Sequence, residues 1–179
     1  MDNKIKAVFF DRDGVVNMRM VNDYVRNIRE FNFLPDFLSF FPKVLKSGCS
    51  VFLITNQQGV SKGIMTLNEL QDVLNFMQNK LIDLYGTGFH DIFYCTDLAD
   101  SGSYYRKPNP GMIIDAVNKW NIDVNKSWVI GDSPTDAAAG KRAGLNTILL
   151  GDYKKQEHPD ADFIVMDLYD IEDKVPIFT

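Results

Sequence analysis

Two aspartates separated by one residue end the first apolar stretch of the chain. Residues 5–10 are mostly apolar, Asp11 and Asp13 follow, and Gly14 marks the point where the chain turns. Two carboxylates held this close in a partly dry pocket repel each other, so that one binds a proton or a cation lies between them. The pair therefore indicates acid–base chemistry or a cation site. The alternative is a turn in which an aspartate hydrogen-bonds its own backbone.

Polar side chains with matching chemistry recur farther along the chain. Thr55, Lys107 and Asp132 each come after an apolar stretch or at the start of the helix that follows it. Carboxylates are ligands for a hard divalent cation, and Mg²⁺ prefers a few oxygens together with waters and a phosphate. A hydroxyl, an ammonium and helix N-termini bind the phosphate itself. Since carboxylates alone would repel a phosphate, the metal ion is a necessary part of this prediction.

Strands that alternate with helices have to bring these side chains together. Short apolar stretches predict strands over residues 5–10, 50–54, 91–95, 127–130, 147–150 and 163–165. Helical periodicity predicts helices that begin near Pro35, Thr66, Asn109–Pro110 and Ser133. The alternation predicts an α/β fold, a doubly wound (Rossmann-like) parallel sheet with helices on both faces. In such a sheet the functional crevice lies outside the carboxyl ends of the strands, where the polar side chains would meet.

Composition and length limit the kind of protein and of partner. The 179 residues contain no linker or repeat, which predicts a single domain over 1–179. The formal charge of -5 argues against nucleic acid, and no apolar stretch approaches the length of a membrane span. No signal peptide precedes the first strand, and two cysteines, Cys49 and Cys95, cannot form a disulfide framework. We therefore expect a cytoplasmic monomer that binds a small phosphorylated metabolite.

Four motifs resemble those of the haloacid dehalogenase (HAD) superfamily, in that family's order. They are Asp11-Arg12-Asp13-Gly14-Val15, Thr55-Asn56-Gln57, Arg106-Lys107-Pro108, and Gly131-Asp132 with Asp136. Tyr24-Val25 and the stretches 55–60 and 106–112 are similar to the branch of small phosphatases that act on histidinol phosphate or heptose bisphosphate. Four motifs together are a specific signal, although one alone would be weak. The resemblance implies a HAD fold with a minimal cap, a Mg²⁺ cofactor and the activity of a phosphoric monoester hydrolase.

The resemblance also implies a role for each motif residue. Asp11 would attack phosphorus and form an aspartyl-phosphate. Asp13 would protonate the departing alkoxide and then activate water, and we expect it to hold a proton because the Asp11 anion raises its pKa. Mg²⁺ would lie between the Asp11 carboxylate, the Asp13 backbone carbonyl and Asp132. Thr55 and Lys107 would hold the phosphoryl oxygens.

Further residues are expected around the substrate. The substrate contacts are predicted to be Asn17, Asn56, Gln57, Lys62 and Arg106. Lys62 and Arg106, with an arginine of the loop 17–33, would bind a second anionic group, which favours a sugar bisphosphate such as D-glycero-D-manno-heptose 1,7-bisphosphate. Asn17 and Gln57 could equally be turn residues. Asp136 is expected to orient Lys107 or a metal-bound water, and its spacing from Ser133 also fits a helix capping box.

Two features leave alternatives open. Relatives in this branch commonly hold zinc with Cys-x-His and a later Cys-x-Cys that precedes Arg-Lys-Pro. Here Cys95 is present, but Asp97, Ser103 and Tyr105 stand at the other positions, so we expect no bound zinc. The substrate could also be histidinol phosphate or another small metabolite. A phospho-receiver domain and a catalytically inert HAD-like scaffold are the alternatives from other classes of protein.

Overall fold

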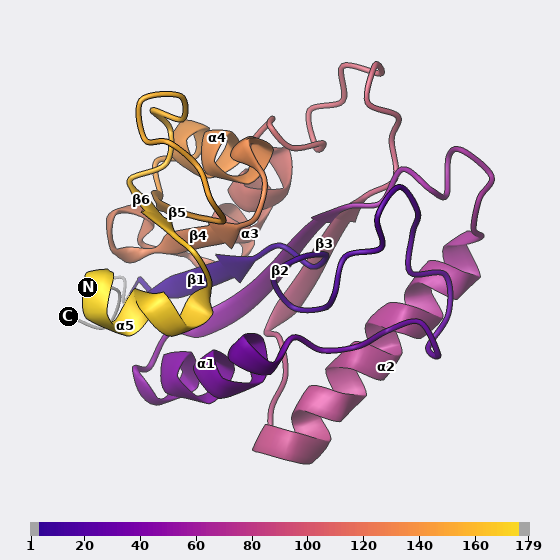
Figure 1. Cartoon of the computed structure of the whole chain (residues 1–179), viewed down its shortest axis with the longest axis horizontal. Helices are drawn as coiled ribbons and strands as arrows, with labels where there is room; N and C mark the ends of the chain where they lie inside the picture. Colours follow the sequence, from indigo (N-terminus) through magenta and orange to yellow (C-terminus); the bar gives the residue numbers. More distant parts are fainter. Residues whose placement is uncertain (1–3, 176–179) are drawn as a thin grey trace.

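Six parallel strands form one sheet in the structure, a computed structural model that describes residues 4–175. The sheet order is β3-β2-β1-β4-β5-β6, and every neighbouring pair is parallel. The strands are β1 (Ala7–Phe10), β2 (Ser50–Asn56), β3 (Asp91–Cys95), β4 (Trp128–Gly131), β5 (Asn146–Leu150) and β6 (Phe163–Val165). Figure 1 shows the sheet between layers of helices, which confirms the predicted doubly wound α/β fold.

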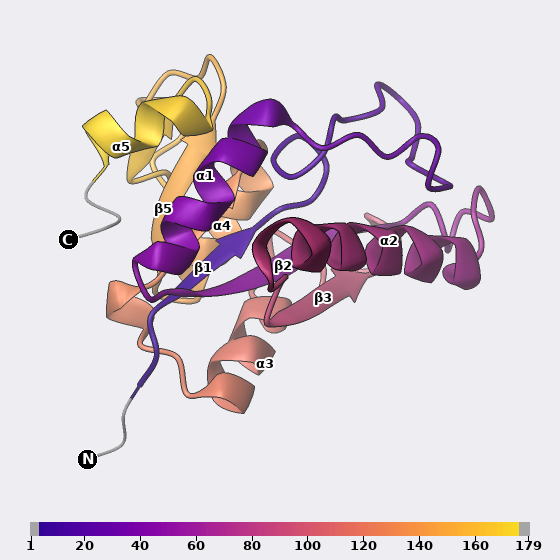
Figure 2. The same ribbon diagram turned by 90° about the horizontal axis from the view of Figure 1, so that it is seen from below.

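Helices cover both faces of this sheet (Figures 1 and 2). Helices α1 (Pro35–Lys46) and α2 (Leu67–Tyr85) pack on one face, together with the short α5 (Ile171–Lys174). Helices α3 (Gly111–Trp120) and α4 (Pro134–Arg142) pack on the other face. Single turns of 3-10 helix lie at Val124–Lys126 and Leu168–Asp170. No helix within residues 4–175 combines the length and the apolar character that crossing a lipid bilayer requires.

The central strand β1 shows why this sequence makes a buried sheet. Its side chains alternate, so that Val8 and Phe10 pack in the α1–α2 layer while Ala7 and Phe9 pack in the α3–α4 layer. All four are completely buried, as expected for a parallel sheet that is covered on both faces. The ring of Phe10 meets Phe37 of α1 edge-on at a centroid distance of 5.5 Å. These contacts fix the end of β1, where Asp11 begins.

Local signals predict three helix starts correctly and one incorrectly. Pro35 is the first residue of α1, as predicted. Thr66 and Glu69 form the expected capping box of α2, and Ser133 with Asp136 forms that of α4. For α3 the sequence predicts Asn109 as the cap and Pro110 as the first helical residue, but Pro110 takes the cap position without a side-chain hydrogen bond. The Asn109 amide donates instead to the Ser103 carbonyl at 2.8 Å.

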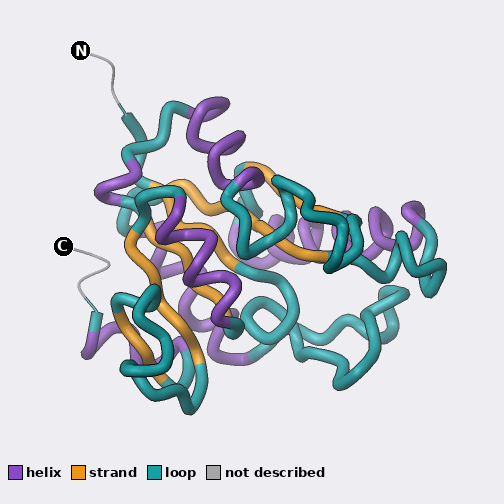
Figure 3. Tube along the Cα trace, turned by 90° about the horizontal axis from the view of Figure 1, so that it is seen from above, coloured by secondary structure: helices purple, strands orange, loops and turns teal. Residues whose placement is uncertain are grey.

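Long loops join the strands to the helices (Figure 3). The loop 17–33 contains no helix or extended strand, yet Val25 and Phe31 in it are buried in the core. Strand β2 continues two residues beyond the predicted end, so Thr55 lies within the strand rather than after it. This end of the sheet carries the candidate site.

Candidate active site

The carboxyl ends of the central strands open into one cavity of about 500 Å³. Strand β1 lies between β2 and β4, so the chain order reverses here, which is where ligands bind in open α/β sheets. The cavity is lined by site residues from both sides of this point, namely Asp11, Asp13, Thr55, Asn56, Lys107 and Asp136, and by Arg19, Met20, Tyr24, Gln58, Lys62 and Ile64 from two loops. The structure thus brings together residues that are up to 125 positions apart between Asp11 and Asp136.

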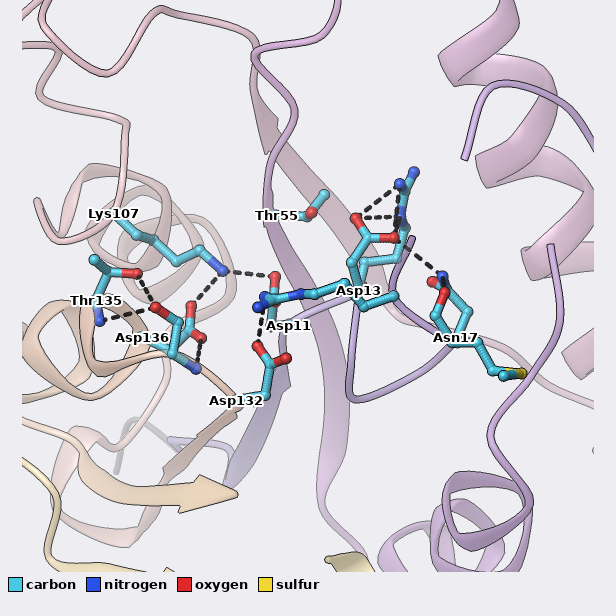
Figure 4. A network of polar contacts seen from close by, with 12 residues as sticks. Asp11, Asp13, Asn17, Thr55, Lys107, Asp132, Thr135 and Asp136 are labelled. Atoms are coloured by element: carbon cyan, nitrogen blue, oxygen red, sulfur yellow. Dashed lines mark hydrogen bonds and ion pairs between the residues drawn. The ribbon is translucent and has the colours of Figure 1, made fainter. Parts of the chain in front are cut away.

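Lys107 is the centre of the buried charge network in Figure 4. Its Nζ lies 2.7 Å from Oδ1 of Asp11 and 2.6 Å from Oδ1 of Asp136, and it donates to the Ile54 carbonyl at 2.9 Å. Burial acts to lower the pKa of Lys107, but the two carboxylates outweigh it and raise that pKa. The side chain is therefore a fixed positive charge beside Asp11. Asp136 also accepts from the Ser133 N–H at 3.0 Å, so it combines the two expected roles.

Three carboxylates could hold a cation beside this lysine. Oxygens of Asp11, Asp132 and Asp136 lie within 4.8 Å of one another. Burial, opposed by Lys107 and supported by Asp136, raises the pKa of Asp11 to about 6. Burial and the nearby Asp11 charge raise the pKa of Asp132 to about 7. The three carboxylates of this cluster outnumber the cations beside them, and carboxylate oxygens are the hard donors that Mg²⁺ prefers.

Asp132 is held in a narrow space. Gly14 has φ of 92°, and a Cβ atom at this position would lie 1.9 Å from Oδ2 of Asp132. The Tyr153 hydroxyl donates to the Asp132 backbone carbonyl at 2.9 Å, and Nη2 of Arg19 lies 2.7 Å from Oδ1. Arg19 had no individual role in the sequence-based prediction, because a pair 113 residues apart leaves no local signal.

The Asp13 carboxylate turns away from Asp11 (Figure 4). It accepts from Nη2 of Arg12 at 2.8 Å, from Nε2 of Gln57 at 2.8 Å and from Nδ2 of Asn17 at 3.0 Å. Burial acts to raise the pKa of Asp13, but the Arg12 guanidinium and these hydrogen bonds lower it overall. The expectation that Asp11 keeps Asp13 protonated is therefore wrong for this structure, since Arg12 compensates the Asp13 charge directly.

Arg12 is a site residue that the sequence reasoning missed. Its side chain is completely buried and also donates to Oε1 of Gln57 at 3.2 Å. An arginine directly after a buried strand needs a buried partner, because an unpaired charge is costly in the interior. That rule could have marked the position between Asp11 and Asp13 as part of the site.

The predicted substrate contacts divide into two groups. Asn17 and Gln57 are completely buried and hold Asp13 rather than lining the cavity. Gln57 also donates to Oγ1 of Thr55 at 2.8 Å. Lys62 lines the cavity, as a substrate contact should.

The other two predicted contacts lie around Lys107. Asn56 lines the cavity, and its amide forms a pair of hydrogen bonds with the Lys107 backbone at 2.9 and 3.1 Å. Arg106 lines an adjoining hollow of about 210 Å³, which shares Lys107 and Thr135 with the cavity, and donates to the Asp97 carbonyl at 3.1 Å. The structure therefore does not bring Arg106 to the same cavity as Lys62.

Residues at the positions of the zinc loop contact one another. Sγ of Cys95 lies 3.5 Å from Oδ2 of Asp97 and 3.8 Å from Oγ of Ser103. The backbone N–H of Tyr105 donates to the same Ser103 hydroxyl at 3.2 Å. Hydrogen bonds therefore hold this loop together.

Comparison with known proteins finds relatives that are named for the same activity. Residues 104–171 match the family described as "HAD-hyrolase-like". The chain is 34% identical over 167 residues to the D-glycero-alpha-D-manno-heptose-1,7-bisphosphate 7-phosphatase of Photorhabdus laumondii, which covers 89% of this chain and 88% of the relative. It is 33% identical over 152 residues to the D-glycero-beta-D-manno-heptose-1,7-bisphosphate 7-phosphatase of Pasteurella multocida, with 81% of each chain covered.

A solved structure agrees with these relatives. The D,D-heptose 1,7-bisphosphate phosphatase from B. bronchiseptica, complexed with magnesium and phosphate, superposes with a TM-score of 0.83 at 27% identity. The match covers 94% of this chain and 97% of the other. The relatives found by sequence and this structural neighbour are therefore all named as heptose bisphosphate phosphatases.

Proposed function

Because the chain belongs to the HAD-like phosphatases, which are phosphoric monoester hydrolases, we propose that it removes one phosphate from a sugar bisphosphate, D-glycero-D-manno-heptose 1,7-bisphosphate. The observation that carries this proposal is the 34% identity over 89% of the chain to an enzyme named for that substrate. The relatives are named for both anomers, so the proposal covers both.

The cavity offers support for a substrate with two anionic groups. Lys107 lies against Asp11, where the phosphate to be removed would bind. Lys62 and Arg19 line the same cavity and come from two other loops. A second phosphate would bind Lys62, because Arg19 already pairs with Asp132. A monophosphate such as histidinol phosphate would leave Lys62 without an anionic ligand.

We propose that catalysis divides between the two aspartates. An oxygen of Asp11 attacks phosphorus and the substrate alkoxide leaves, which gives an aspartyl-phosphate that water then hydrolyses. Asp13 gives a proton to the alkoxide and takes one from the water. Because Arg12 favours the ionised form of Asp13, the carboxylate has to gain a proton and turn from Arg12 before the first step. Thr55 and Lys107 hold the phosphoryl oxygens.

Mg²⁺ is the proposed cofactor. The Asp11 and Asp132 carboxylates, with the Asp13 backbone carbonyl, would hold it, and Asp136 stays on Lys107. When bound, the ion would compensate the negative charge of the transferring phosphoryl group. The excess of carboxylates in this cluster supports the assignment.

Two further proposals concern the domain organisation and the location of the protein. We propose that residues 1–179 act as one domain, since all six strands join in one sheet. The free thiols of Cys49 and Cys95 are consistent with a reducing cytoplasm.

A panel of phosphate esters tests the proposed function. Heptose 1,7-bisphosphate of both anomers, histidinol phosphate and an aryl phosphate are compared with Mg²⁺ and with EDTA, using wild type and Asp11→Asn. We expect the highest kcat/KM for a heptose bisphosphate, dependence on Mg²⁺, and a loss on the order of 10³-fold or more in Asp11→Asn. Equal rates on all esters would contradict the substrate. Stable phosphorylation without turnover would indicate a receiver domain, and no reaction at all an inert scaffold.

A further inference from the structure

Arg19 forms an ion pair with Asp132, one of the proposed metal ligands. Its Nη2 lies 2.7 Å from Oδ1 of Asp132, and the opposite oxygen, Oδ2, lies against the backbone of Gly14. Arg19 therefore pairs with Oδ1, while the Gly14 backbone restricts the space around Oδ2. A cation that coordinates Asp132 through Oδ1 has to displace the guanidinium.

The charges around Asp132 favour such an exchange. When ionised, Asp11, Asp132 and Asp136 carry three negative charges, which Lys107 and Arg19 compensate only in part. A divalent cation in place of Arg19 brings the group to neutrality, while a divalent cation together with Arg19 makes it positive. The Arg19 side chain is 50% exposed, so the guanidinium can leave into water at little cost.

Few other contacts hold residues 19–22 of the loop 17–33, whereas the Met18 N–H donates to the Asn32 carbonyl at 2.9 Å. For residues 18–22, all of which the structure describes, the Arg19–Asp132 pair is the side-chain interaction that reaches a distant element. Met18 is 56% and Val21 85% exposed. Farther along, Tyr24 packs against Gly59 and anchors the loop independently.

We propose that Arg19 is the counter-ion of Asp132 in the metal-free protein and competes with Mg²⁺ for that carboxylate, so that metal binding releases residues 18–22 from the start of α4. The inference rests on the proposed function, because it takes Asp132 as a metal ligand. It adds a device in this chain that couples metal binding to the position of a loop that lines the substrate cavity.

Isothermal titration with Mg²⁺ alone, without substrate, tests the competition. Wild type is compared with Arg19→Gln, and with Arg29→Gln, which removes the same charge from an exposed position of the same loop. We expect Arg19→Gln to bind Mg²⁺ roughly 1.5- to five-fold more tightly, the range for loss of a partly exposed ion pair. Arg29→Gln should match wild type. Unchanged or weaker binding by Arg19→Gln would overturn the competition.

Hydrogen exchange provides a readout that does not depend on affinity. The Met18 N–H donates to the Asn32 carbonyl at 2.9 Å, so its exchange reports whether this part of the loop loosens. In wild type, saturating Mg²⁺ should speed exchange of the Met18 amide, and in Arg19→Gln this exchange should be fast with or without Mg²⁺. Slower or unchanged exchange in wild type on Mg²⁺ binding would overturn the release. Asp132→Asn separates the two proposals: if it binds Mg²⁺ as tightly as wild type, or if wild type binds none, the metal site of the proposed function fails and the inference with it.

Discussion

The ammonium of Lys107 and the carboxylate of Asp136 lie 2.6 Å apart, and their side chains are only 3% and 2% exposed. Asp136 comes from the first turn of α4, where it also completes the capping box with Ser133. One aspartate therefore joins the start of a helix to the lysine that contacts Asp11. The capping of α4 and the position of the proposed catalytic lysine therefore depend on the same residue.

Asp136→Asn should lower both the stability and the activity of the protein. Removing one partner of a buried pair typically costs about 3–5 kcal/mol, and because Asp11 still contacts Lys107 we expect about 2–4 kcal/mol in the free energy of unfolding. The value for kcat should fall on the order of 10²-fold, since Lys107 loses a fixed position. Urea denaturation and steady-state kinetics measure the two effects. Glu172→Gln, which breaks an exposed pair with Lys43, should cost less than about 1 kcal/mol.

Gln57 and Gln58 are adjacent in sequence but should behave differently on truncation. Gln57 is buried and binds both Asp13 and Thr55, whereas Gln58 lines the cavity. We expect Gln57→Ala to lower kcat roughly 10- to 100-fold with little change in KM, because Asp13 loses its orientation. Gln58→Ala should affect KM alone. If Gln57→Ala raised KM at constant kcat, the residue would be a substrate contact after all.

Asp11 and Asp132 make the stability of the metal-free protein depend on pH. Burial raises their pKa values from 3.8 to about 6 and about 7 in the folded state. Their contribution to stability is therefore fully present below the unfolded value and is lost as the pH rises through 6 and 7. We expect the Tm in EDTA to fall between about pH 5 and about pH 8. Asp132→Asn should reduce this slope, and Mg²⁺, which binds the ionised carboxylates, should stabilise more at the higher pH. An equal slope in the variant would contradict the assignment.

The polar residues at the carboxyl ends of the strands could be predicted from the sequence. Asp11, Thr55 and Asp132 follow from one rule, because parallel strands turn polar at the same edge of the sheet. The capping residues Thr66 and Ser133 could also be predicted, since each contacts a residue only two or three positions away.

Contacts between distant side chains could not be predicted in the same way. Whether Gln57 faces the cavity or Asp13 depends on how β2 and β1 pack, which the order of residues does not specify. The Arg19–Asp132 ion pair, which joins residues 113 positions apart, is of the same kind. Asn109 shows the limit of local rules, because its tertiary contact with Ser103 replaces the cap.

The loop before Arg106 leads to a prediction about metal content. Cys95 contacts Asp97 and Ser103, and a structural zinc site requires about four soft or borderline ligands. We expect elemental analysis of the purified protein to find no stoichiometric zinc. The Tm should also be the same in the presence and absence of a zinc chelator, in contrast to the response to Mg²⁺ removal. One zinc per chain would contradict this prediction.

Lys62 should determine the preference for a second phosphate. It lines the cavity at the strand ends, whereas Arg106 lines an adjoining hollow and donates to the Asp97 carbonyl. Since a charge-assisted hydrogen bond contributes about 1.5–3 kcal/mol, we expect Lys62→Ala to lower kcat/KM for the bisphosphate roughly ten- to hundred-fold more than for an aryl phosphate.

Arg106→Ala is the matched comparison, because it removes a cation of the other loop that was predicted from the sequence to bind the same group. From its position we expect the ratio of kcat/KM values for bisphosphate and aryl phosphate to change less than about three-fold. Steady-state kinetics on both esters for the two variants measure this ratio. If Arg106→Ala lost the discrimination and Lys62→Ala kept it, the second phosphate would bind on the side of the 96–106 loop, and the substrate would have to extend from the cavity toward that hollow.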